Sequence, residues 1–293
     1  IRDVERSRGL GDVYKRQIWG GNMKDDLKTR LITAFSIFPF VVLCFISYKS
    51  LVGLVSAVVL LAGYELLSMK FKDYMRFFYL GLLVSYPIFY GLFFFKEPYI
   101  VILSLFLISS VVTIFSIKDT STILDRIVYP IFGLVYVSGA LSFFMPIYKE
   151  FGSANALLTL TAVWIFDTSA YFTGMKFGRI RISPRYSPKK SLEGVLGGFL
   201  GTLAFSMIYK IIAERFFKSW VISYQELFLF SLIVSVMGTL GDIFESAIKR
   251  SFGLKDSGSV LPGHGGMLDR IDGLLFVTPV VYIMLKVLKG GIM

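Results

Sequence analysis

Residues 51–69 read LVGLVSAVVLLAGYELLSM, an apolar run in which Glu65 is the one charged residue. A helix of this length crosses most of the roughly 30 Å hydrocarbon core of a bilayer. Comparable apolar runs occur at 31–47, 74–95, 99–117, 127–148, 155–174, 193–213, 225–247 and 269–289. Backbone polar groups in lipid must be paired within their own segment, so each run is expected to be a helix. The sequence therefore predicts an all-α polytopic membrane protein with about nine transmembrane helices.

The composition supports a chain whose solvent is lipid. Of its 293 residues, 55% are hydrophobic and only 17% are charged, whereas about a quarter are charged in a soluble domain. The net charge of +11 is interpreted as basic loops beside anionic lipid, and not as a nucleic-acid-binding surface. The single cysteine, Cys44, excludes a disulfide framework and a cysteine metal cluster.

Three segments of the chain differ in character. Residues 1–22 are polar and basic, lack the apolar stretch of a signal peptide and precede Met23; we interpret them as a non-native or disordered leader. Residues 23–150 hold predicted helices one to five. Residues 151–293 hold helices six to nine and two long polar loops, 175–192 and 248–268. Loops longer than a connection requires are often functional, so this last segment is expected to carry the catalytic loops.

The distribution of basic residues predicts the orientation. The loops on the N-terminal side of the predicted helices contain 17 Lys and Arg residues, against 8 on the opposite side. Because positively charged loops remain in the cytoplasm, the N-terminal side and both long loops are expected there. The predicted location is a bacterial-type inner (plasma) membrane, with the site facing the cytoplasm.

Two acidic pairs stand at the ends of the last two predicted helices. Asp242 and Glu245 are three residues apart, as are Asp269 and Asp272, which places each pair on one helix face. Unpaired carboxylates are costly at a membrane, and oxygen ligands suit a hard cation such as Mg²⁺. We predict a Mg²⁺ site with ligands Asp242, Asp269 and Asp272, Glu245 as a further candidate ligand, and room for a second cation. The alternative is that Asp269 and Asp272 merely cap a helix.

The segment between these acids has the character of an anion site. Residues 262–266, Pro-Gly-His-Gly-Gly, directly precede a predicted helix, where converging backbone N–H groups and the helix dipole favour phosphate. Nearby cations suit a triphosphate. The predicted contacts are Lys249, Arg250, Lys255, His264, Gly265, Gly266 and Arg270. For His264, the only histidine, a phosphate hydrogen bond or a loop-shaping role is favoured over acid–base catalysis.

The first loop and the preceding helix add further candidates. Ser187, Lys189 and Lys190 precede a helix rich in glycine; small residues permit close packing, so this helix is expected to sit centrally. Asp167, inside an apolar run, is a functional candidate because intramembrane acids usually are. Glu65 is a weaker one, since it can reach the interface.

The second loop and its flanks, residues 246–272, follow a recognisable pattern. They fit S-x-x-K-R-x4-K-D-x-G-x2-L-P-G-H-G-G-x-x-D-R-x-D throughout, and in this they resemble the signature of the phosphatidate cytidylyltransferase (CDP-diacylglycerol synthase) family. Asp167 and residues 187–194 also resemble that family, whereas the N-terminal half resembles it mainly in hydropathy.

The resemblance implies an integral membrane enzyme of phospholipid synthesis that joins CTP and phosphatidic acid into CDP-diacylglycerol and pyrophosphate. It also implies dependence on Mg²⁺ at the acids that match Asp242, Asp269 and Asp272. Lys249 and Arg250 complete the catalytic set we predict, while Lys189 and Lys190 fit either the lipid phosphate or CTP. The expected partners are CTP, phosphatidic acid and membrane lipids, without nucleic acid; a homodimer is left open.

Three other functions compete with this interpretation. A CTP-dependent polyprenol or phytol kinase would transfer the γ-phosphate and release CDP. A transporter also uses intramembrane acids and glycine-rich helices, but places its acids near the bilayer midplane. A lipid-binding scaffold that has lost activity would not need acids at all three metal positions.

Overall fold

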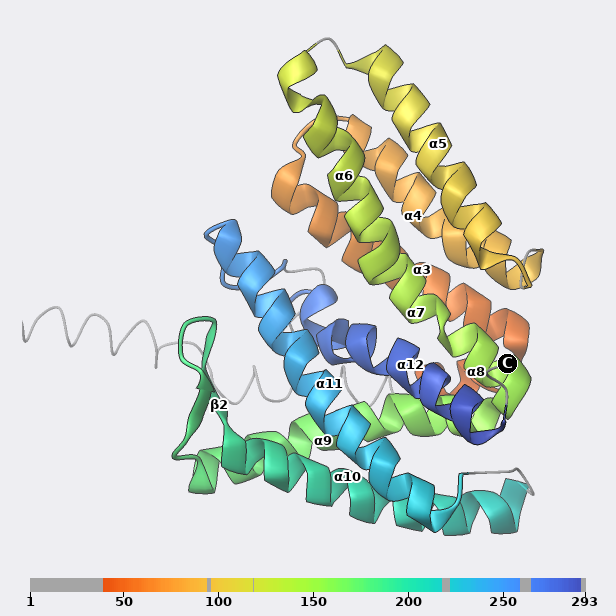
Figure 1. Ribbon diagram of the computed structural model, residues 1–293, viewed down its shortest axis with the longest axis vertical. Coiled ribbons are helices and arrows are strands. Elements are labelled where there is room, and N and C mark those ends of the chain that lie inside the picture. Colours follow the sequence, from red (N-terminus) through yellow and green to blue (C-terminus); the bar gives the residue numbers. More distant parts are fainter. Residues whose placement is uncertain (1–38, 94–95, 118, 218–221, 259–264, 291–293) are drawn as a thin grey trace, which may run out of the picture.

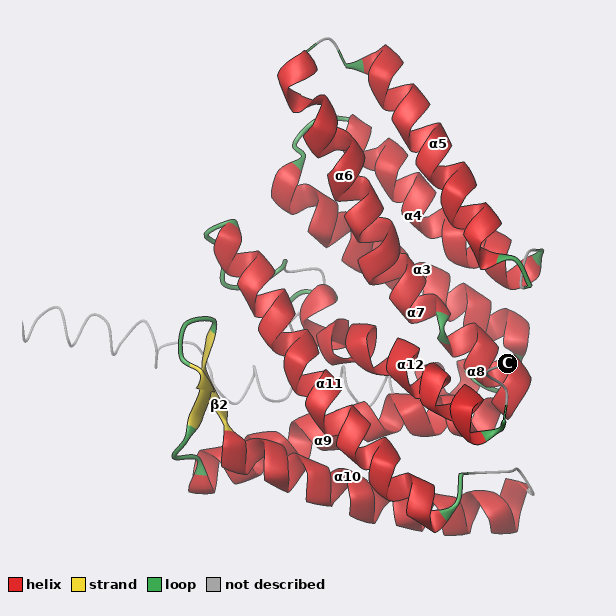
Figure 2. Ribbon diagram, viewed as in Figure 1, coloured by secondary structure: helices red, strands yellow, loops and turns green. Residues whose placement is uncertain are grey.

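The computed structural model describes residues 39–93, 96–117, 119–217, 222–258 and 265–290, and is almost entirely helical (Figures 1 and 2). The helices of the first half are α3 (Tyr48–Lys70), α4 (Met75–Leu92), α5 (Pro98–Ser116), η1 (Thr120–Thr122), α6 (Ile123–Gly133), η2 (Leu134–Gly139), α7 (Ala140–Ser142) and α8 (Phe144–Phe151). The second half contains α9 (Ser153–Phe177), β1 (Arg181–Ser183), β2 (Ser187–Ser191), α10 (Leu192–Ile212), η3 (Ala213–Phe217), α11 (Tyr224–Ser251) and α12 (Leu268–Leu288).

Eight helical stretches in the described residues are long and apolar enough to cross a membrane. They are Tyr48–Lys70, Met75–Leu92, Pro98–Ser116, Thr120–Phe151, Ser153–Phe177, Leu192–Arg215, Tyr224–Ser251 and Leu268–Leu288. Each overlaps one predicted span, which confirms the all-α polytopic class. Most of the first predicted span, 31–47, lies outside the described residues, although 39–44 are helical. The predicted leader, 1–22, lies wholly outside them.

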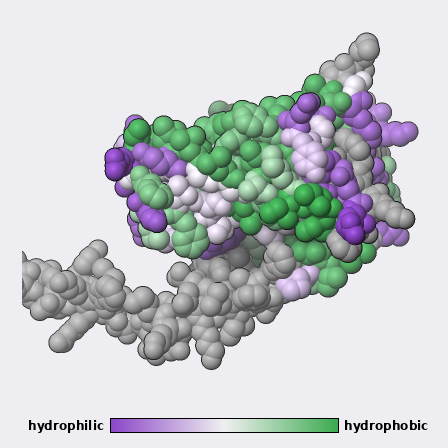
Figure 3. All heavy atoms as spheres, turned by 90° about the horizontal axis from the view of Figure 1, so that it is seen from below, coloured by the Kyte–Doolittle hydropathy of each residue, from purple (hydrophilic) through white to green (hydrophobic). Residues whose placement is uncertain are grey.

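The outer surface is the kind that lipid covers. Large apolar side chains stand exposed along α5, among them Leu103, Leu107, Val111 and Phe115. The face in Figure 3 is green, or hydrophobic, over much of its middle, with purple hydrophilic residues mainly toward its ends. Exposure of so much apolar surface is unfavourable in water. The chain is therefore an integral membrane protein.

The stretch from α6 to α8 is not a regular helix. Pro130 lies inside α6, and the π-helical segment η2 begins four residues later. Proline has no N–H to donate and its ring displaces the carbonyl one turn earlier, so irregular hydrogen bonding is expected here. Ser138, within η2, donates its hydroxyl to the carbonyl of Leu83 on α4 at 2.9 Å. The irregular turn is thereby held against the N-terminal helices.

Helices α9 and α10 pack closely through glycines, as predicted, but α10 is not central. A Cβ on Gly198 would lie 2.5 Å from ring carbons of Phe166 on α9, so only glycine permits this approach. The opposite face of α10 is exposed, including Leu196 and Leu200, and Figure 1 shows the helix at the edge of the molecule. The prediction of a central position was wrong because close packing requires small residues on one face only.

The first predicted loop, 175–192, contains regular structure. Strands β1 and β2 form an antiparallel hairpin in which Arg181 pairs with Ser191 and Ser183 with Ser187. Arg181 Nη1 donates to the carbonyl of Lys189 at 2.8 Å. The carboxylate of Glu193, in the first turn of α10, accepts the backbone N–H of Arg179 at 3.0 Å. The hairpin is thus fixed to α10, and β2 carries Ser187, Lys189 and Lys190 at defined positions.

Candidate active site

The site begins where α11 and α12 approach each other. A Cβ on Gly241 would lie 3.1 Å from the Cα of Gly273 and would also collide with the Asp272 carbonyl. The two backbones therefore meet at these glycines. Asp242 and Asp272 are their immediate neighbours in the sequence, so the helix contact brings one acid of each predicted pair to the same place.

Four residues from four elements form what we call the Asp242 cluster: Asp167 of α9, Lys190 of β2, Asp242 of α11 and Asp272 of α12. Lys190 Nζ forms an ion pair with Asp242 Oδ2 at 2.7 Å, and the three carboxylates lie within electrostatic range of one another and of Lys190. Arg270 lies within electrostatic range of Asp167. The structure thus joins Asp167 and the first loop to the acids of α11 and α12.

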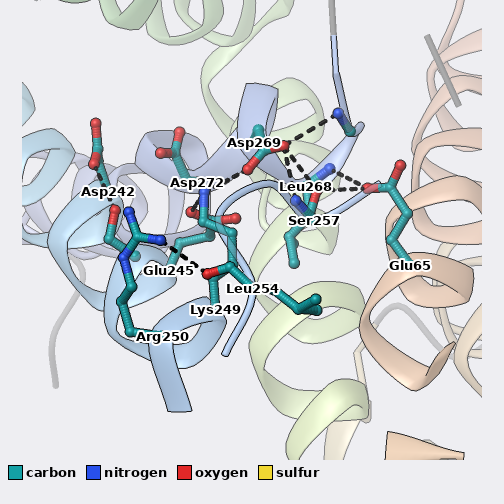
Figure 4. A network of polar contacts seen from close by, with 12 residues as sticks. Glu65, Asp242, Glu245, Lys249, Arg250, Leu254, Ser257, Leu268, Asp269 and Asp272 are labelled. Atoms are coloured by element: carbon teal, nitrogen blue, oxygen red, sulfur yellow. Dashed lines mark hydrogen bonds and ion pairs between the residues drawn. The ribbon is translucent and has the colours of Figure 1, made fainter. Parts of the chain in front are cut away.

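A second group, the Lys249 cluster, consists of Glu245, Lys249, Ser257, Gly266 and Asp269; Figure 4 labels all of them except Gly266. Lys249 Nζ lies 2.5 Å from Glu245 Oε2 and 2.5 Å from Asp269 Oδ1. Asp269 Oδ2 accepts from the N–H and hydroxyl of Ser257, at 3.1 and 3.0 Å, and from the N–H of Gly266 at 3.1 Å. Both oxygens of Asp269 are therefore bound by protein donors. Glu245 Oε1, in contrast, is buried without a hydrogen-bond partner.

Glu65 has a larger role than its sequence position indicated. Its carboxylate, only 3% exposed, accepts the N–H groups of Met267 and Leu268, both at 2.9 Å, and the hydroxyl of Ser257 at 3.0 Å. Figure 4 shows it reaching from α3 toward these groups. Ser257 was missed altogether as a site residue. Contacts that span 192 to 203 residues of sequence leave no local signal, and the only hint was an acid inside an apolar run.

Several predicted phosphate contacts are exposed on the surface. Lys189, Arg250 and Lys255 are exposed, and Arg250 Nη1 donates to the carbonyl of Leu254 at 3.0 Å. Gly265 has a φ of +80°, a backbone conformation that favours glycine. His264 lies outside the described residues, so its predicted role stays a prediction.

The acids offer oxygen ligands, but not a closed cage. Within the described part of the chain, no three His, Cys, Asp or Glu side chains converge closely enough to hold a metal by themselves. Mg²⁺ usually binds one or two carboxylates and completes its shell with water and substrate phosphates. The carboxylates of the Asp242 cluster fit that requirement, since the three acids there outnumber the two cations within electrostatic range, Lys190 and Arg270. Metal ligation by Asp242, Asp269 and Asp272 stays a prediction, and Asp269 would have to exchange one of its present contacts.

A cavity of about 360 Å³ lies at the other end of α12. Its lining includes Tyr86, Glu150, Tyr282 and Lys286. It contains none of the predicted site residues and is not the candidate active site.

Comparison with known proteins fits this arrangement. A sequence model of the cytidylyltransferase family matches residues 28–288. The chain belongs to the cytidylyltransferase family. The phosphatidate cytidylyltransferase of Thermotoga maritima is 55% identical over 267 residues, which cover 91% of this chain and 98% of that relative. Those of Bacillus subtilis and Staphylococcus saprophyticus are each 36% identical over 171 residues, or 58% of this chain and 61% of each relative. The family predicted from residues 246–272 is confirmed.

Proposed function

We propose that this protein transfers the CMP group of CTP to phosphatidic acid, giving CDP-diacylglycerol and pyrophosphate for phospholipid synthesis. The observation that carries the proposal is the convergence of Asp167, Lys190, Asp242 and Asp272 from three membrane-spanning helices and the hairpin. The relative that is 55% identical along nearly its whole length is named for this activity. A membrane-embedded acidic site suits a reaction between a soluble nucleotide and a lipid.

The reaction requires charge stabilisation more than proton transfer. A phosphate oxygen of phosphatidic acid attacks the α-phosphorus of CTP, a new P–O bond forms, and the bond to the β-phosphate oxygen breaks as pyrophosphate leaves. A phosphate monoester is already ionised near neutral pH, so no strong general base is needed. Fixed positive charge is the main contribution a protein makes to such transfers. Lys190 and Arg270 lie within electrostatic range of the acids, and we propose Arg250 and Lys255 as further cations for the phosphates.

Asp242 and Asp272 are the residues we propose to hold Mg²⁺, with substrate phosphates completing the shell. The metal would neutralise charge on the phosphates and on the leaving pyrophosphate. Lys190 is paired with Asp242 through a side chain that is partly exposed, so it can exchange this carboxylate for a phosphate oxygen. Lys249 has a different task, because it is buried between Glu245 and Asp269 and fixes the relative positions of α11 and α12.

The positive-inside bias of the loops supports a site that faces the cytoplasm, where CTP is found. Both loops that border the site, 175–192 and 248–268, lie on the basic side of the predicted topology. We propose the inner membrane of a bacterial-type cell as the location. Phosphatidic acid would then reach the site within the bilayer, and CTP from the aqueous side.

The test uses purified protein in lipid nanodiscs with phosphatidic acid, Mg²⁺ and CTP labelled in the cytidine. We expect lipid-extractable label, one pyrophosphate released per labelled lipid, and loss of both with EDTA. D272N should abolish the product, whereas D125N should retain it, since Asp125 forms only an exposed ion pair with Lys70. Wild-type protein that leaves all label in the aqueous phase would contradict the proposed function. Full activity of D272N would contradict the proposed metal ligands.

A further inference from the structure

The N-terminus of α12 is capped by a residue of a distant helix. The first N–H groups of any helix have no partner within the helix and need an acceptor. The N-cap residue of α12, Met267, has no side chain that can accept. Glu65 of α3 supplies both oxygens instead: Oε1 accepts the N–H of Met267 and Oε2 that of Leu268, each at 2.9 Å. The positive end of the helix dipole favours a carboxylate in this position.

Ser257 extends this cap to Asp269. Its hydroxyl lies 3.0 Å from Glu65 Oε2 and 3.0 Å from Asp269 Oδ2. One hydroxyl proton serves one acceptor at a time, but the N–H of Ser257 also donates to Asp269 Oδ2, at 3.1 Å. Ser257 is therefore fixed between the two carboxylates, and any movement of Glu65 would be passed to Asp269.

The space around these groups leaves little freedom. A Cβ on Gly266 would lie 2.8 Å from Glu65 Oε2 and 2.9 Å from Asp269 Oδ2. The Gly266 N–H donates to the same Asp269 oxygen at 3.1 Å. The Asp269 side chain thus has one oxygen held by Ser257 and Gly266 and the other held by Lys249.

We infer that Glu65 is a positioning residue, which fixes the start of α12 and, through Ser257, orients Asp269 toward Lys249. Its effect on turnover rests on the proposed function. Burying a carboxylate is costly unless hydrogen bonds compensate it; here the N–H groups of Met267 and Leu268 do so, joined by the Ser257 hydroxyl when it donates to Glu65. All three belong to the segment that precedes or begins α12, so Glu65 links the N-terminal helices directly to the catalytic segment.

The chain offers a matched control. Glu150, on α8, also contacts α12 with its carboxylate, but near the other end of that helix. It accepts from Tyr282 Oη at 3.1 Å and from Lys286 Nζ at 2.8 Å. E150Q therefore makes the same chemical change, in a carboxylate that binds the same helix, far from the acidic clusters. A general loss of helix packing would affect both variants alike.

The experiment compares E65Q, S257A and E150Q with the wild type in nanodiscs. Glutamine has one acceptor oxygen and one donor amide group. In E65Q the amide NH2 therefore faces the backbone N–H of Met267 or Leu268, and neither group can accept. We expect the kcat of E65Q to fall about tenfold or more, which corresponds to the loss of one charge-assisted hydrogen bond. The backbone amides of residues 266–268 should exchange with deuterium faster by a similar factor. S257A should lower kcat but leave exchange at 267–268 unchanged, because Glu65 still caps them. E150Q should match the wild type in both measurements.

Unchanged exchange at 266–268 in E65Q would overturn the inference, as would wild-type kcat in that variant. An equal loss of kcat in E150Q would also overturn it, by showing a general packing effect. If wild-type protein transfers no label from CTP to lipid, the proposed function fails. The exchange measurement would still decide in that case whether Glu65 fixes the start of α12.

Discussion

Replacing Lys249 gives the most quantitative test of which contacts hold the Lys249 cluster together. The Lys249 side chain is 11% exposed and lies 2.5 Å from each of two carboxylates, Glu245 at 1% and Asp269 at 16% exposure. Replacing it by methionine keeps the aliphatic volume but leaves both acids without their cation. Removing one partner of a buried ion pair costs about 3–5 kcal/mol, because the remaining charge stays desolvated. We expect K249M to lose at least that much free energy of unfolding.

The control is an ion pair of nearly the same length in a different environment. Lys70 and Asp125 are 2.6 Å apart, but their side chains are 35% and 61% exposed. Exposed pairs contribute about 0–1 kcal/mol, since water screens them and the side chains lose entropy. K70M should therefore change the free energy of unfolding by no more than this amount. The difference between the two variants combines the effect of burial with that of the second carboxylate that Lys249 binds.

The measurement is an SDS titration in mixed micelles, with unfolding followed by circular dichroism. K249R should recover part of the loss, because it restores the charge but not the geometry of a compact ammonium. Equal destabilisation in K249M and K70M would refute the argument. That result would mean that Glu245 and Asp269 are hydrated, and that the described contacts do not hold α11 against α12.

Three further variants test separate parts of the structure. G198A should lower the free energy of unfolding by about 1–3 kcal/mol through overpacking, because its Cβ would lie 2.5 Å from ring carbons of Phe166 on α9. The control G81A has open space around its Cβ and should not be destabilised. Equal melting temperatures for the two variants would contradict the close packing of α9 and α10. G266A should reduce turnover strongly, since its Cβ would collide with Ser257 Oγ, would lie 2.8 Å from Glu65 Oε2 and must displace them; a labelled-CTP assay beside a melting curve checks this, and normal turnover would contradict the close packing. K190Q should lower kcat about 10- to 100-fold by removing fixed positive charge while the melting temperature hardly changes, because its pair with Asp242 is partly exposed; a large melting shift with normal kcat would oppose that assignment.

Hydropathy was sufficient to predict most of the fold. A membrane helix must be long and apolar, so spans such as 225–247 and 269–289 could be read directly and lie close to Tyr224–Ser251 and Leu268–Leu288. The hairpin of β1 and β2 was not predicted. Its strands are short, and a segment such as Ser-Pro-Lys-Lys-Ser has neither an alternating pattern nor the β-branched residues that favour strands.

The part of the site that could be predicted is the part in which acidic residues recur at a fixed spacing. The three-residue spacing identified both acidic pairs, and the structure brings Asp242 and Asp272 together through the glycine contact of their helices. The structure also separates the three predicted metal ligands, because Asp269 belongs to the Lys249 cluster while Asp242 and Asp272 belong to the Asp242 cluster. Which helix face meets which neighbour depends on tertiary packing, and a single sequence carries no local signal of it. The same reason explains why the role of Glu65 and the presence of Ser257 were not foreseen.

The most direct test of the account is the fate of each phosphorus atom of CTP. Parallel reactions with phosphatidic acid and Mg²⁺ would contain CTP labelled with ³²P at either the α- or the γ-position. The account predicts that the α-label becomes lipid-extractable while the γ-label leaves as pyrophosphate. Lipid that carries the γ-label, with CDP as the released product, would contradict it and identify the protein as a CTP-dependent lipid kinase.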